Sequence, residues 1–567
     1  MTRAARIALA GAAAAVTIAA VARLPRTADA TVDVQLLAIN DFHGALEPAS
    51  GGTGQIGGTD AGGIEYLATH LARLRATNPN TLVVSAGDNI GGSPLLSSLF
   101  HDEIAIEALD LAGLQASALG NHDLDEGWWE LYRMQRGGCH PVDGCQDGTP
   151  FQGASFPYLA ANVALDPRHV EADVLARAGV QGTEPRPLLP AYAIREVDGV
   201  RIGFIGLILQ EAPAVILPAS VRGLTFLPEA EAANEAAAAL RAQDVRAMVV
   251  LMHQGGVQTG RDINGCDGMS RDLTALVTRF SRDIDVVVSG HRHQAYNCTI
   301  DGRLVTSASA NGRVLTDIDL RIRRSDGEVV GTSALNVIVT RDVTKDATQS
   351  ALLTRYRPIA EQVGARVVGA ITDSLTRAET RAGEMPLGRV LADLYLDAGR
   401  TVPGGGAELA FMNPGGIRAD LVASGSTRPA PVTYAELFAV LPFSNELTVK
   451  SVSGAALVEV LEQQFGEERT RMLQVSDGFT YAYDPTRPPG ARVDRASVRI
   501  HGLPIDAARR YRLVTNSILW AGGDGFAALK SGTDPVTLGV DVDVVADSFS
   551  RRSPVRPAAR ERIHRTR

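Results

Sequence analysis

Cysteine is scarce in this chain, and the few that occur are not spaced for zinc binding. Four Cys lie at positions 139, 145, 266 and 298 of 567 residues, and no pair has the CxxC spacing. A zinc knuckle is therefore disfavoured, and disulfides in an oxidising compartment fit better. Cys139 and Cys145 flank a short loop and could close it, which would leave Cys266 and Cys298 as the second pair. Free thiols are the alternative.

An excess of basic residues is also missing. The chain holds 55 Lys and Arg against 64 Asp and Glu, a net charge of −9 at pH 7. Proteins that follow the phosphate backbone of a nucleic-acid polymer present a basic surface to it. We therefore expect no nucleic-acid polymer among the partners of this protein.

The N-terminal apolar run is too short to predict a membrane span. It covers residues 7–21, it follows Arg3 and Arg6, and it precedes Ala28-Asp29-Ala30, which has the small-x-small form of a cleavage site. These features predict a secretory signal over residues 1–30, with a membrane anchor as the alternative. We expect an exported protein, secreted or attached to the cell envelope, with no transmembrane span.

The length and overall composition of the chain indicate a globular protein with more than one domain. At 45% hydrophobic and 21% charged residues, its composition is that of a globular protein, and its 567 residues are too many for a single hydrophobic core. Alternating and buried-type patterns predict strands at 32–39, 81–86, 158–163, 200–209, 247–252 and 284–289, and helices at 64–75 and 230–243. Strand, turn and helix in repetition are typical of a layered α/β domain. The less regular second half, with strands at 409–412, 496–500 and 512–515, predicts another α/β domain, and the Arg-rich tail from residue 551 is expected to be solvated.

Polar clusters follow five of the apolar segments. The densest is residues 120–127, Gly-Asn-His-Asp-Leu-Asp-Glu-Gly, and the others contain Asp41 and His43, Asp88, His253, and His291 with His293. Because chemistry in such domains lies on the loops after the strands, we expect these side chains to meet. A solvated turn, or a hydrogen-bonded role for each histidine alone, is the alternative for any single cluster.

The combined donors indicate a metal centre. The candidates are Asp41, His43, Asp88, Asn121, His122, Asp125, His253, His291 and His293. Oxygen and imidazole donors together suit zinc, manganese or cobalt rather than calcium. One cation would not use so many ligands, whereas two cations that share a bridging carboxylate would, and that arrangement suits phosphoester hydrolysis.

These motifs resemble those of a known superfamily and, with the second half, of one family within it. Asp41-x-His43, Gly87-Asp88, Gly120-Asn121-His122-Asp123, His253 and Gly290-His291-x-His293 resemble the motif set of calcineurin-like metallophosphoesterases. The second half adds Asn413-Pro-Gly-Gly-Ile-Arg418, Leu441-Pro-Phe443-Ser-Asn445 and Gly522-Gly523-Asp524-Gly525-Phe526. Together they resemble the secreted 5′-nucleotidase family, which includes UDP-sugar hydrolases and cyclic-nucleotide phosphodiesterases.

The resemblance implies an architecture and a role for each donor. It implies an α/β fold: a four-layer αββα sandwich over residues 31–343, a linker helix over 344–364, and a substrate-binding α/β domain over 365–563. One cation would be held by Asp41, His43, Asp88 and His293, and the second by Asp88, Asn121, His253 and His291, with Asp88 bridging. His122 would be the catalytic imidazole, and Asp125 would orient it.

The resemblance also implies where a nucleotide would bind. Arg381 and Arg418 match phosphate-contacting arginines, Asn413 and Asp524 match residues near the nucleoside, and Phe443 matches one of two rings that sandwich the base. The second ring falls on Ile518, and Arg389 stands where the family usually has Asn. Both departures leave the preferred base open.

The expected activity is release of inorganic phosphate from nucleoside 5′-phosphates, with UDP-sugars as further substrates. A 2′,3′-cyclic nucleotide phosphodiesterase with 3′-nucleotidase activity is the alternative enzyme. A non-catalytic nucleotide-binding surface protein is the alternative from another class. The oligomeric state is not predicted.

Overall fold

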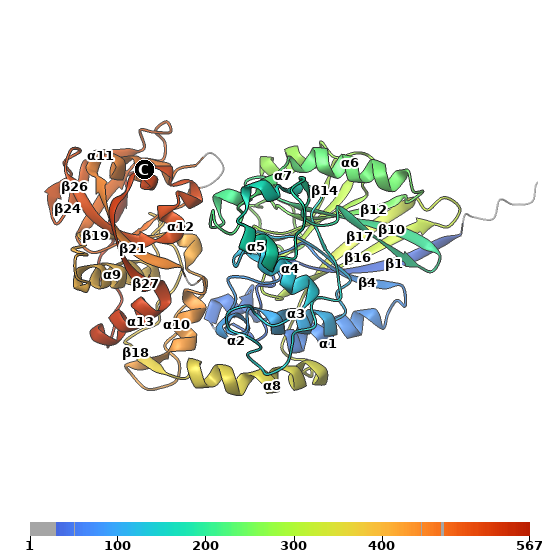
Figure 1. Cartoon of the computed structure of the whole chain (residues 1–567), viewed down its shortest axis with the longest axis horizontal. Coiled ribbons are helices and arrows are strands. Elements are labelled where there is room, and N and C mark those ends of the chain that lie inside the picture. Colours follow the sequence, from blue (N-terminus) through green and yellow to red (C-terminus); the bar gives the residue numbers. More distant parts are fainter. Residues whose placement is uncertain (1–29, 50, 444, 467–469) are drawn as a thin grey trace, which may run out of the picture.

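The chain folds into two α/β units joined by one long helix. The computed structural model describes residues 30–49, 51–443, 445–466 and 470–567, so the predicted secretory signal, apart from Ala30, lies outside the described residues. Figure 1 shows the units side by side, with helix α8 (Ala347–Gly364) running below the first unit to the lower edge of the second.

The first unit contains two six-stranded sheets. One has the order β17-β16-β1-β4-β5-β6, with bounds Val329–Ile338, Val314–Arg323, Thr31–Ile39, Thr81–Ser85, Ala116–Ala118 and Tyr158–Leu159. The other has the order β14-β15-β13-β12-β10-β9, with bounds Ala295–Ile300, Arg303–Ala308, Val286–Ser289, Ala247–His253, Val200–Ile208 and Tyr192–Val197. The first unit also contains two small sheets. One pairs β2 (Gln55–Ile56) with β3 (Thr59–Asp60), and the other has the order β11-β7-β8, with bounds Leu224–Phe226, Val163–Leu165 and Arg186–Pro187.

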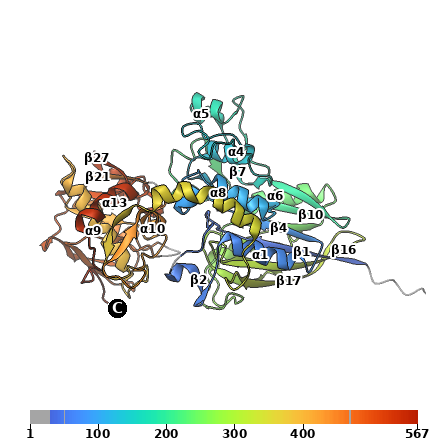
Figure 2. The same cartoon turned by 90° about the horizontal axis from the view of Figure 1, so that it is seen from below.

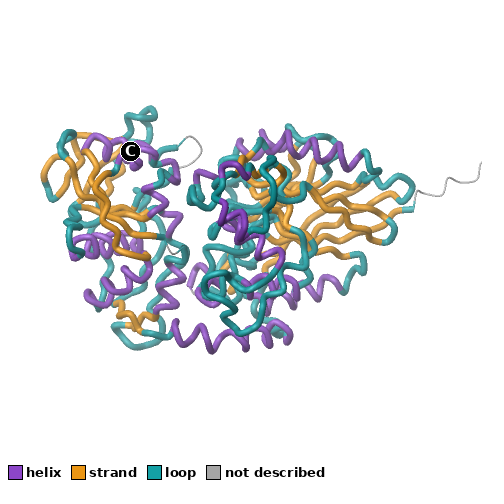
Figure 3. The backbone as a smooth tube through the Cα atoms, viewed as in Figure 1, coloured by secondary structure: helices purple, strands orange, loops and turns teal. Residues whose placement is uncertain are grey.

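Helices cover the outer faces of both sheets, as Figure 3 shows. They are α1 (Ile64–Arg75), α2 (Leu95–Ser98), α3 (Glu103–Leu111), α4 (Trp128–Arg136), α6 (Glu229–Arg241) and α7 (Arg271–Val277), whereas α5 (Ala172–Arg177) packs on α4 and projects outward in Figure 2. Side chains along β1 point alternately to the two faces of its sheet, and both faces are buried. Val34 and Leu36 face the core between the two sheets, whereas Leu37 faces the core under α1 and α3. The second sheet packs its other face on α6 and α7. The predicted four-layer αββα sandwich is confirmed.

Most predicted elements of this unit are present. The helix predicted at 64–75 is α1, and the strands at 32–39, 81–86, 200–209, 247–252 and 284–289 correspond to β1, β4, β10, β12 and β13. The strand predicted at 158–163 is wrong as one element, because β6 and β7 are separate. Between them, the buried Asn162 donates hydrogen bonds to the carbonyls of Ile208 (2.6 Å) and Leu227 (3.0 Å), which turns the chain.

The connecting helix α8 is anchored on the first unit. It begins where the Asp346 carboxylate accepts hydrogen bonds from the backbone of Thr348 and Gln349, both at 2.9 Å, which caps its first turn. The helix continues through Pro358 to Gly364. Tyr356 on its inner face packs edge-on against Phe100, with ring centroids 4.9 Å apart. Figure 2 shows α8 crossing from one unit to the other.

The second unit is built on a five-stranded sheet with the order β22-β19-β26-β21-β27, bounds Gln474–Val475, Leu409–Met412, Arg510–Asn516, Glu446–Ser453 and Thr533–Val540. A four-stranded sheet has the order β25-β24-β23-β28, bounds Leu503–Pro504, Val493–Ile500, Phe479–Tyr483 and Ile563–Arg565, and β18 (Val367–Ile371) pairs with β20 (Ala430–Thr433). Its helices are α9 (Pro386–Thr401), α10 (Tyr434–Val440), α11 (Gly454–Gln463), α12 (Ser517–Trp520) and α13 (Asp541–Arg552). The three strands predicted here are confirmed as parts of β19, β24 and β26.

The tail predicted to be solvated from residue 551 is exposed along most of its length, but it is not a free end. The chain returns to the second unit as β28, which pairs with β23. Arg562 is buried, and its guanidinium donates to both carboxylate oxygens of Asp393 at 2.7 and 2.9 Å. The arginine count alone did not reveal that this residue is held by an acidic partner.

Both disulfides form in the pairing considered from the sequence. Cys139 bonds Cys145, closing the segment 139–145 that we call the disulfide loop, and Cys266 bonds Cys298 on β14. Among the described residues, no helix combines the length and apolarity that crossing a membrane requires.

Candidate metal centre and substrate cavity

Seven predicted ligands converge where strands of the two sheets end. Parallel strands β1, β4 and β5 lead to Asp41, Asp88 and Asn121, and parallel strands β12 and β13 lead to His253 and His291. Because carboxyl ends of parallel strands lie at the same edge of a sheet, two stacked sheets bring these loops together. His43 and His293 follow two residues after Asp41 and His291.

The backbone at these ligands is strained. Asp41, His43, Asp88, His291 and His293 all have a positive φ, between 50° and 71°. Non-glycine residues rarely adopt this left-handed conformation, and where they do they cluster at functional sites. The left-handed turns direct successive side chains of each loop toward one point.

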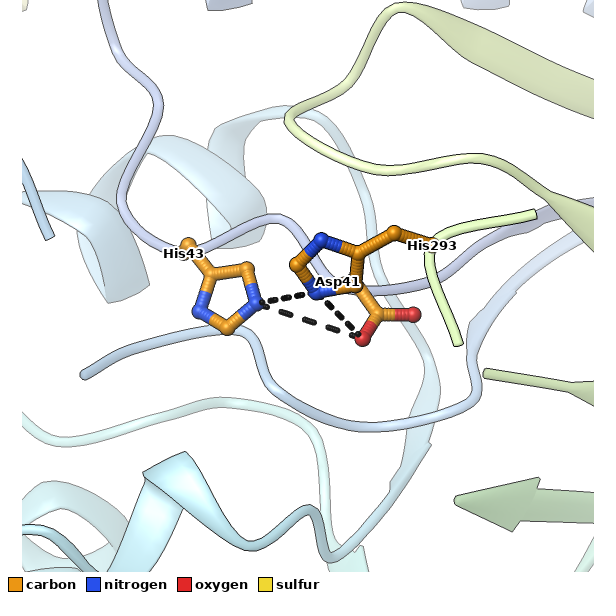
Figure 4. A group of neighbouring side chains, drawn as sticks. All are labelled: Asp41, His43 and His293. Atoms are coloured by element: carbon orange, nitrogen blue, oxygen red, sulfur yellow. Dashed lines mark hydrogen bonds and ion pairs between the residues drawn. The ribbon is translucent and has the colours of Figure 1, made fainter. Parts of the chain in front are cut away.

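The first group of ligands is Asp41, His43 and His293. Figure 4 shows the two imidazoles and the carboxylate pointing at one another. The Nε2 atoms of His43 and His293 are 3.1 Å apart, and Asp41 Oδ1 lies 3.9 and 3.3 Å from them. Asp88 Oδ2 is 3.6 Å from His43 Nε2, so it adjoins this group.

The second group is formed by Asp88, Asn121, His253 and His291. Asp88 Oδ2 lies 3.0 Å from His253 Nε2, and Asn121 Oδ1 lies 2.9 Å from His291 Nδ1. Asp88 therefore faces both groups, as a bridging ligand must. The geometry brings together all seven residues that the resemblance implied as ligands.

The donor set fits divalent cations. His253 Nε2 is buried and has no aligned hydrogen-bond partner within the described parts of the chain, although Asp88 Oδ2 is near. Burial by itself raises the pKa of Asp88, but the imidazoles of His253 and His122 outweigh it and hold that pKa well below its usual range. A buried charged carboxylate among converging imidazole nitrogens is costly unless a cation pairs with it.

His122 and Asp125 form a pair beside these ligands. His122 Nδ1 lies 2.9 Å from Asp125 Oδ2, and the backbone N–H of His122 donates to Asp88 Oδ1 at 2.8 Å. Burial lowers the pKa of His122, but the carboxylates of Asp125 and Asp88 raise it above its usual value. The ring is therefore favoured in its charged form, as a group that stabilises negative charge should be.

Asp123 is a positioning residue that the sequence analysis named within a motif but to which it assigned no role. Its buried carboxylate accepts backbone hydrogen bonds from Gly120 (2.7 Å), Asp88 (3.0 Å) and Asn89 (3.1 Å). These bonds tie the loop after β5 to the loop after β4. The role could have been suspected from its place in the densest polar cluster, but the partners depend on the fold.

A cavity of about 260 Å³ joins the metal-ligand groups to the second unit. Asn413, Arg418, Phe443 and Asp524, all predicted to bind substrate, line it together with His122, Asp125, Ile518 and ligands of both groups. Asn413 Nδ2 donates to Asp524 Oδ2 at 2.7 Å. Phe443 stacks on His122, with ring centroids 5.2 Å apart and planes 20° from parallel. Val215 and Leu217 of the first unit also line the cavity, and no local sequence signal marked them.

The arginines divide into those near the cavity and those away from it. Arg418 Nη2 lies 3.3 Å from His43 Nε2, and its guanidinium lies 5.4 Å from the Phe443 ring centre. Arg381 is exposed and lies near Tyr483, so its predicted phosphate contact stays a prediction. Arg377, which was not predicted, lines a neighbouring cavity of about 750 Å³ together with Arg418 and His43.

Arg389, the second departure from the family pattern, is buried away from both cavities. Its guanidinium lies 3.8 Å from the carboxylate of Glu384, and its carbonyl accepts from Arg562 at 3.3 Å. It therefore belongs to the network that holds the C-terminal strand.

An αββα sandwich that carries these donors at one sheet edge defines a metallophosphoesterase. Residues 34–295 match the family model described as calcineurin-like phosphoesterase, and residues 367–531 match the model described as 5′-nucleotidase, C-terminal domain. The chain therefore belongs to the 5′-nucleotidase family, which joins these two domains.

Individual proteins match this chain along most of its length. The chain is 31% identical to an endonuclease of Bacillus subtilis over 523 residues and to a cell wall protein of Listeria monocytogenes over 525 residues; these matches cover 91% and 88% of this chain but only 39% and 64% of the two relatives. It is 26% identical over 568 residues to a snake venom 5′-nucleotidase of Gloydius brevicauda, covering 94% of this chain and 88% of that one. The crystal structure of a 5′-nucleotidase precursor from Thermus thermophilus superposes with a TM-score of 0.75 at 25% identity, covering 94% of this chain and 99% of that one.

Proposed function

We propose that this protein hydrolyses nucleoside 5′-monophosphates to nucleoside and inorganic phosphate. The observation that carries the proposal is the shared cavity: Asp88 and His291 line it from one unit, and Arg418, Phe443 and Asp524 line it from the other. A ligand with a phosphate at one end and an aromatic base at the other matches that distribution of cationic, metal-binding and aromatic groups.

Two divalent cations of the zinc, manganese or cobalt type complete the site. Asp41, His43, Asp88 and His293 would hold one, and Asp88, Asn121, His253 and His291 the other. When bound, such a pair supplies Lewis acidity: it makes a water nucleophilic near neutral pH and offsets charge on the phosphoryl oxygens.

The side chains of the chain itself bind and orient the substrate. Arg418 holds the phosphate, and Phe443 leaves His122 to stack on the base. Asp125 accepts the Nδ1–H of His122, so the other ring nitrogen is directed at the phosphoryl group and donates to an oxygen that gains charge. Water adds to phosphorus, the bond from phosphorus to the 5′ oxygen breaks, and the nucleoside leaves as an alcohol.

We also propose a division of labour and a location. Residues 365–563 recognise the nucleoside while residues 31–343 hold the cations, so the cavity depends on how α8 sets the two units. The protein is exported through residues 1–30. Two disulfides and an apolar run followed by a small-x-small site support export.

A second candidate is hydrolysis of nucleotides with a further group beyond the scissile phosphate, such as UDP-sugars. The neighbouring cavity of about 750 Å³ favours it, because this cavity shares His293 and Arg418 with the smaller one and is also lined by His43 and Arg377. Comparing the rates on UDP-glucose, 2′,3′-cyclic AMP and AMP ranks these candidates.

The decisive experiment is phosphate release by metal-stripped protein, with and without added zinc or manganese. We expect metal-dependent release from AMP that is lost in Asp88→Asn and strongly reduced in His122→Ala. Unchanged turnover in either variant would refute the assigned roles. Tight AMP binding without release under every metal condition would identify a binding protein instead.

A further inference from the structure

A second cluster of imidazoles and carboxylates lies outside the catalytic centre, where three loops meet. His101 follows α2, Glu126 directly follows Asp125, and His140 and Asp143 belong to the disulfide loop. None of the four side chains has a part in the hydrolytic mechanism above. Their chemistry nevertheless repeats that of the catalytic centre: two imidazoles and two carboxylates at close range.

Three of these side chains offer ligand atoms to one point. A ring nitrogen of His101, a carboxylate oxygen of Glu126 and a ring nitrogen of His140 all lie within 4.8 Å of one another. His101 Nδ1 is 2.8 Å from Glu126 Oε2. The two imidazoles stack with centroids 3.6 Å apart, so rotation about their side-chain torsions is needed to turn both nitrogens to one cation. Nitrogen and oxygen ligands of Zn²⁺ lie at about 2.0–2.2 Å, which these separations permit.

Asp143 occupies the position of a supporting carboxylate. Its Oδ2 lies 2.9 Å from Nε2 of His101, the nitrogen on the far side of the ring from Glu126. Histidines that bind metals commonly donate their second N–H to a carboxylate, which fixes the tautomer and the ring orientation. Asp143 would therefore leave Nδ1 of His101 with its lone pair toward Glu126 and His140.

The cluster is open to ions from solvent. The side chains of His101 and His140 are 15% and 13% exposed, and those of Glu126 and Asp143 are 45% and 48% exposed. Two imidazoles and one carboxylate with a fourth position open to water are a donor set that zinc accepts. A cation can enter without unfolding of the surrounding loops.

We propose that His101, Glu126 and His140 bind a third divalent cation of the zinc type, with Asp143 orienting His101. This site is distinct from the catalytic pair of cations, and its existence does not depend on the nucleotidase activity. It would fasten the disulfide loop to the loop that carries Asp125.

The proposed site connects to the catalytic centre along two short routes. On one side, Glu126 is the neighbour of Asp125, which orients His122. On the other, His101 precedes Asp102, whose carboxylate accepts from the Gly91 N–H at 2.9 Å. The Gly91 carbonyl in turn lies 2.9 Å from Nδ1 of His43, a catalytic ligand. A bound cation would therefore restrain both loops that position catalytic imidazoles.

Without a cation, the cluster is an ion-pair network. Burial lowers the pKa of His101, but hydrogen bonds with Glu126 and Asp143 outweigh it and raise that pKa to about 9. The ring is then charged near neutral pH, and a cation that binds Nδ1 must displace one proton. The two states therefore differ in proton content as well as in metal content.

Metal analysis of the full-length folded protein tests the proposal. Wild type, His140→Ala, Glu126→Gln and the control His169→Ala are dialysed to equilibrium against the same zinc buffer, and zinc per chain is measured. His169 is an exposed histidine of the same unit, 3.3 Å from Asp166 and remote in sequence from the cluster. We expect His140→Ala and Glu126→Gln to hold one zinc fewer than wild type and the control, whatever number the catalytic centre retains.

Calorimetry gives an independent reading. Zinc titrations should resolve one more binding site in wild type than in Glu126→Gln, a nearly isosteric change, and the circular dichroism spectrum of the variant checks that it is folded. Equal zinc content in wild type and both variants would overturn the proposal and leave only the ion-pair network. Because the measurement counts zinc rather than turnover, it stays informative if AMP hydrolysis fails.

Discussion

Replacing Ile518 by Phe should restore a two-sided clamp on the base. In this structure the cavity offers one aromatic ring, Phe443, while Ile518, Val215 and Leu217 add aliphatic surface. A second ring would give the base a second stacking face. The change should therefore improve recognition of aromatic bases without altering the metal ligands or His122.

The size of the effect follows from stacking energies. Stacking of a base on an aromatic side chain contributes about 1–3 kcal/mol, which corresponds to roughly 5- to 150-fold in affinity. Phe443 must also leave His122, on which it stacks at 5.2 Å. That costs about 0.5–1.5 kcal/mol, but the cost is common to wild type and variant and cancels in their ratio.

The assay compares kcat/KM for AMP with that for ribose 5-phosphate, which carries the same phosphate without a base. In Ile518→Phe the ratio of the two should rise by the factor above, whereas Ile518→Leu, which keeps an aliphatic side chain, should leave it unchanged. A ratio that does not move in a properly folded Ile518→Phe protein would show that residue 518 does not face the base. The aliphatic surface would then have some other role.

Further expectations concern the pair of His122 and Asp125, the divalent cations and the buried carboxylate of Asp541. In Asp125→Asn, kcat for AMP should fall by about 10²- to 10⁴-fold with little change in KM, because His122 loses its orienting charge; an unaltered kcat would contradict that role. Chelation should abolish phosphate release, and zinc or manganese should restore it; activity that persists after verified metal removal would exclude the two-cation site. Burial raises the pKa of Asp541 to about 7, so between about pH 4 and that value the folded state keeps a proton that the unfolded chain has lost. The free energy of unfolding of wild type should therefore fall as pH rises through this window, by at most about 4 kcal/mol. Urea denaturation at several pH values should show that this slope is absent in Asp541→Asn, and identical slopes would refute the assignment.

The cation ligands could be predicted because their signal is local. Asp41 stands two residues after the end of β1, and His253 is the last residue of β12, so each donor is marked by the apolar strand before it. The topology of the sheets then brings these donors together, because the carboxyl ends of parallel strands lie at one edge of a sheet. The same reasoning predicted α1 at its observed bounds.

The substrate cavity could be predicted only in part, because it depends on how two units meet. Val215 and Leu217 are aliphatic residues in a loop, and nothing nearby in sequence separates them from ordinary packing residues. Arg377 and Arg381 are four residues apart, yet of the two cavities next to the metal ligands Arg377 lines one and Arg381 lines neither. A turn intervenes after residue 380, where Gly383 donates to the Thr380 carbonyl at 2.9 Å, and its direction was not readable from sequence.

A motif specifies which residues can bind a metal, but the backbone conformation determines where their side chains point. The spacing of Asp41 and His43 suits side chains on one face of an extended chain, but both residues are left-handed, so it is the turn that aims them. His101 and Asp102 share this conformation, with φ of 49° and 61°. So do Asp198 and Asp301, which lie in ordinary turns, so a positive φ alone does not identify a ligand. What distinguishes His101 is that Glu126 and His140, from two other loops, present donors to the same point. The donors of the third site come from loops that no strand marks in the sequence, and only the fold brings them together. For that reason the third site could not be predicted from the sequence.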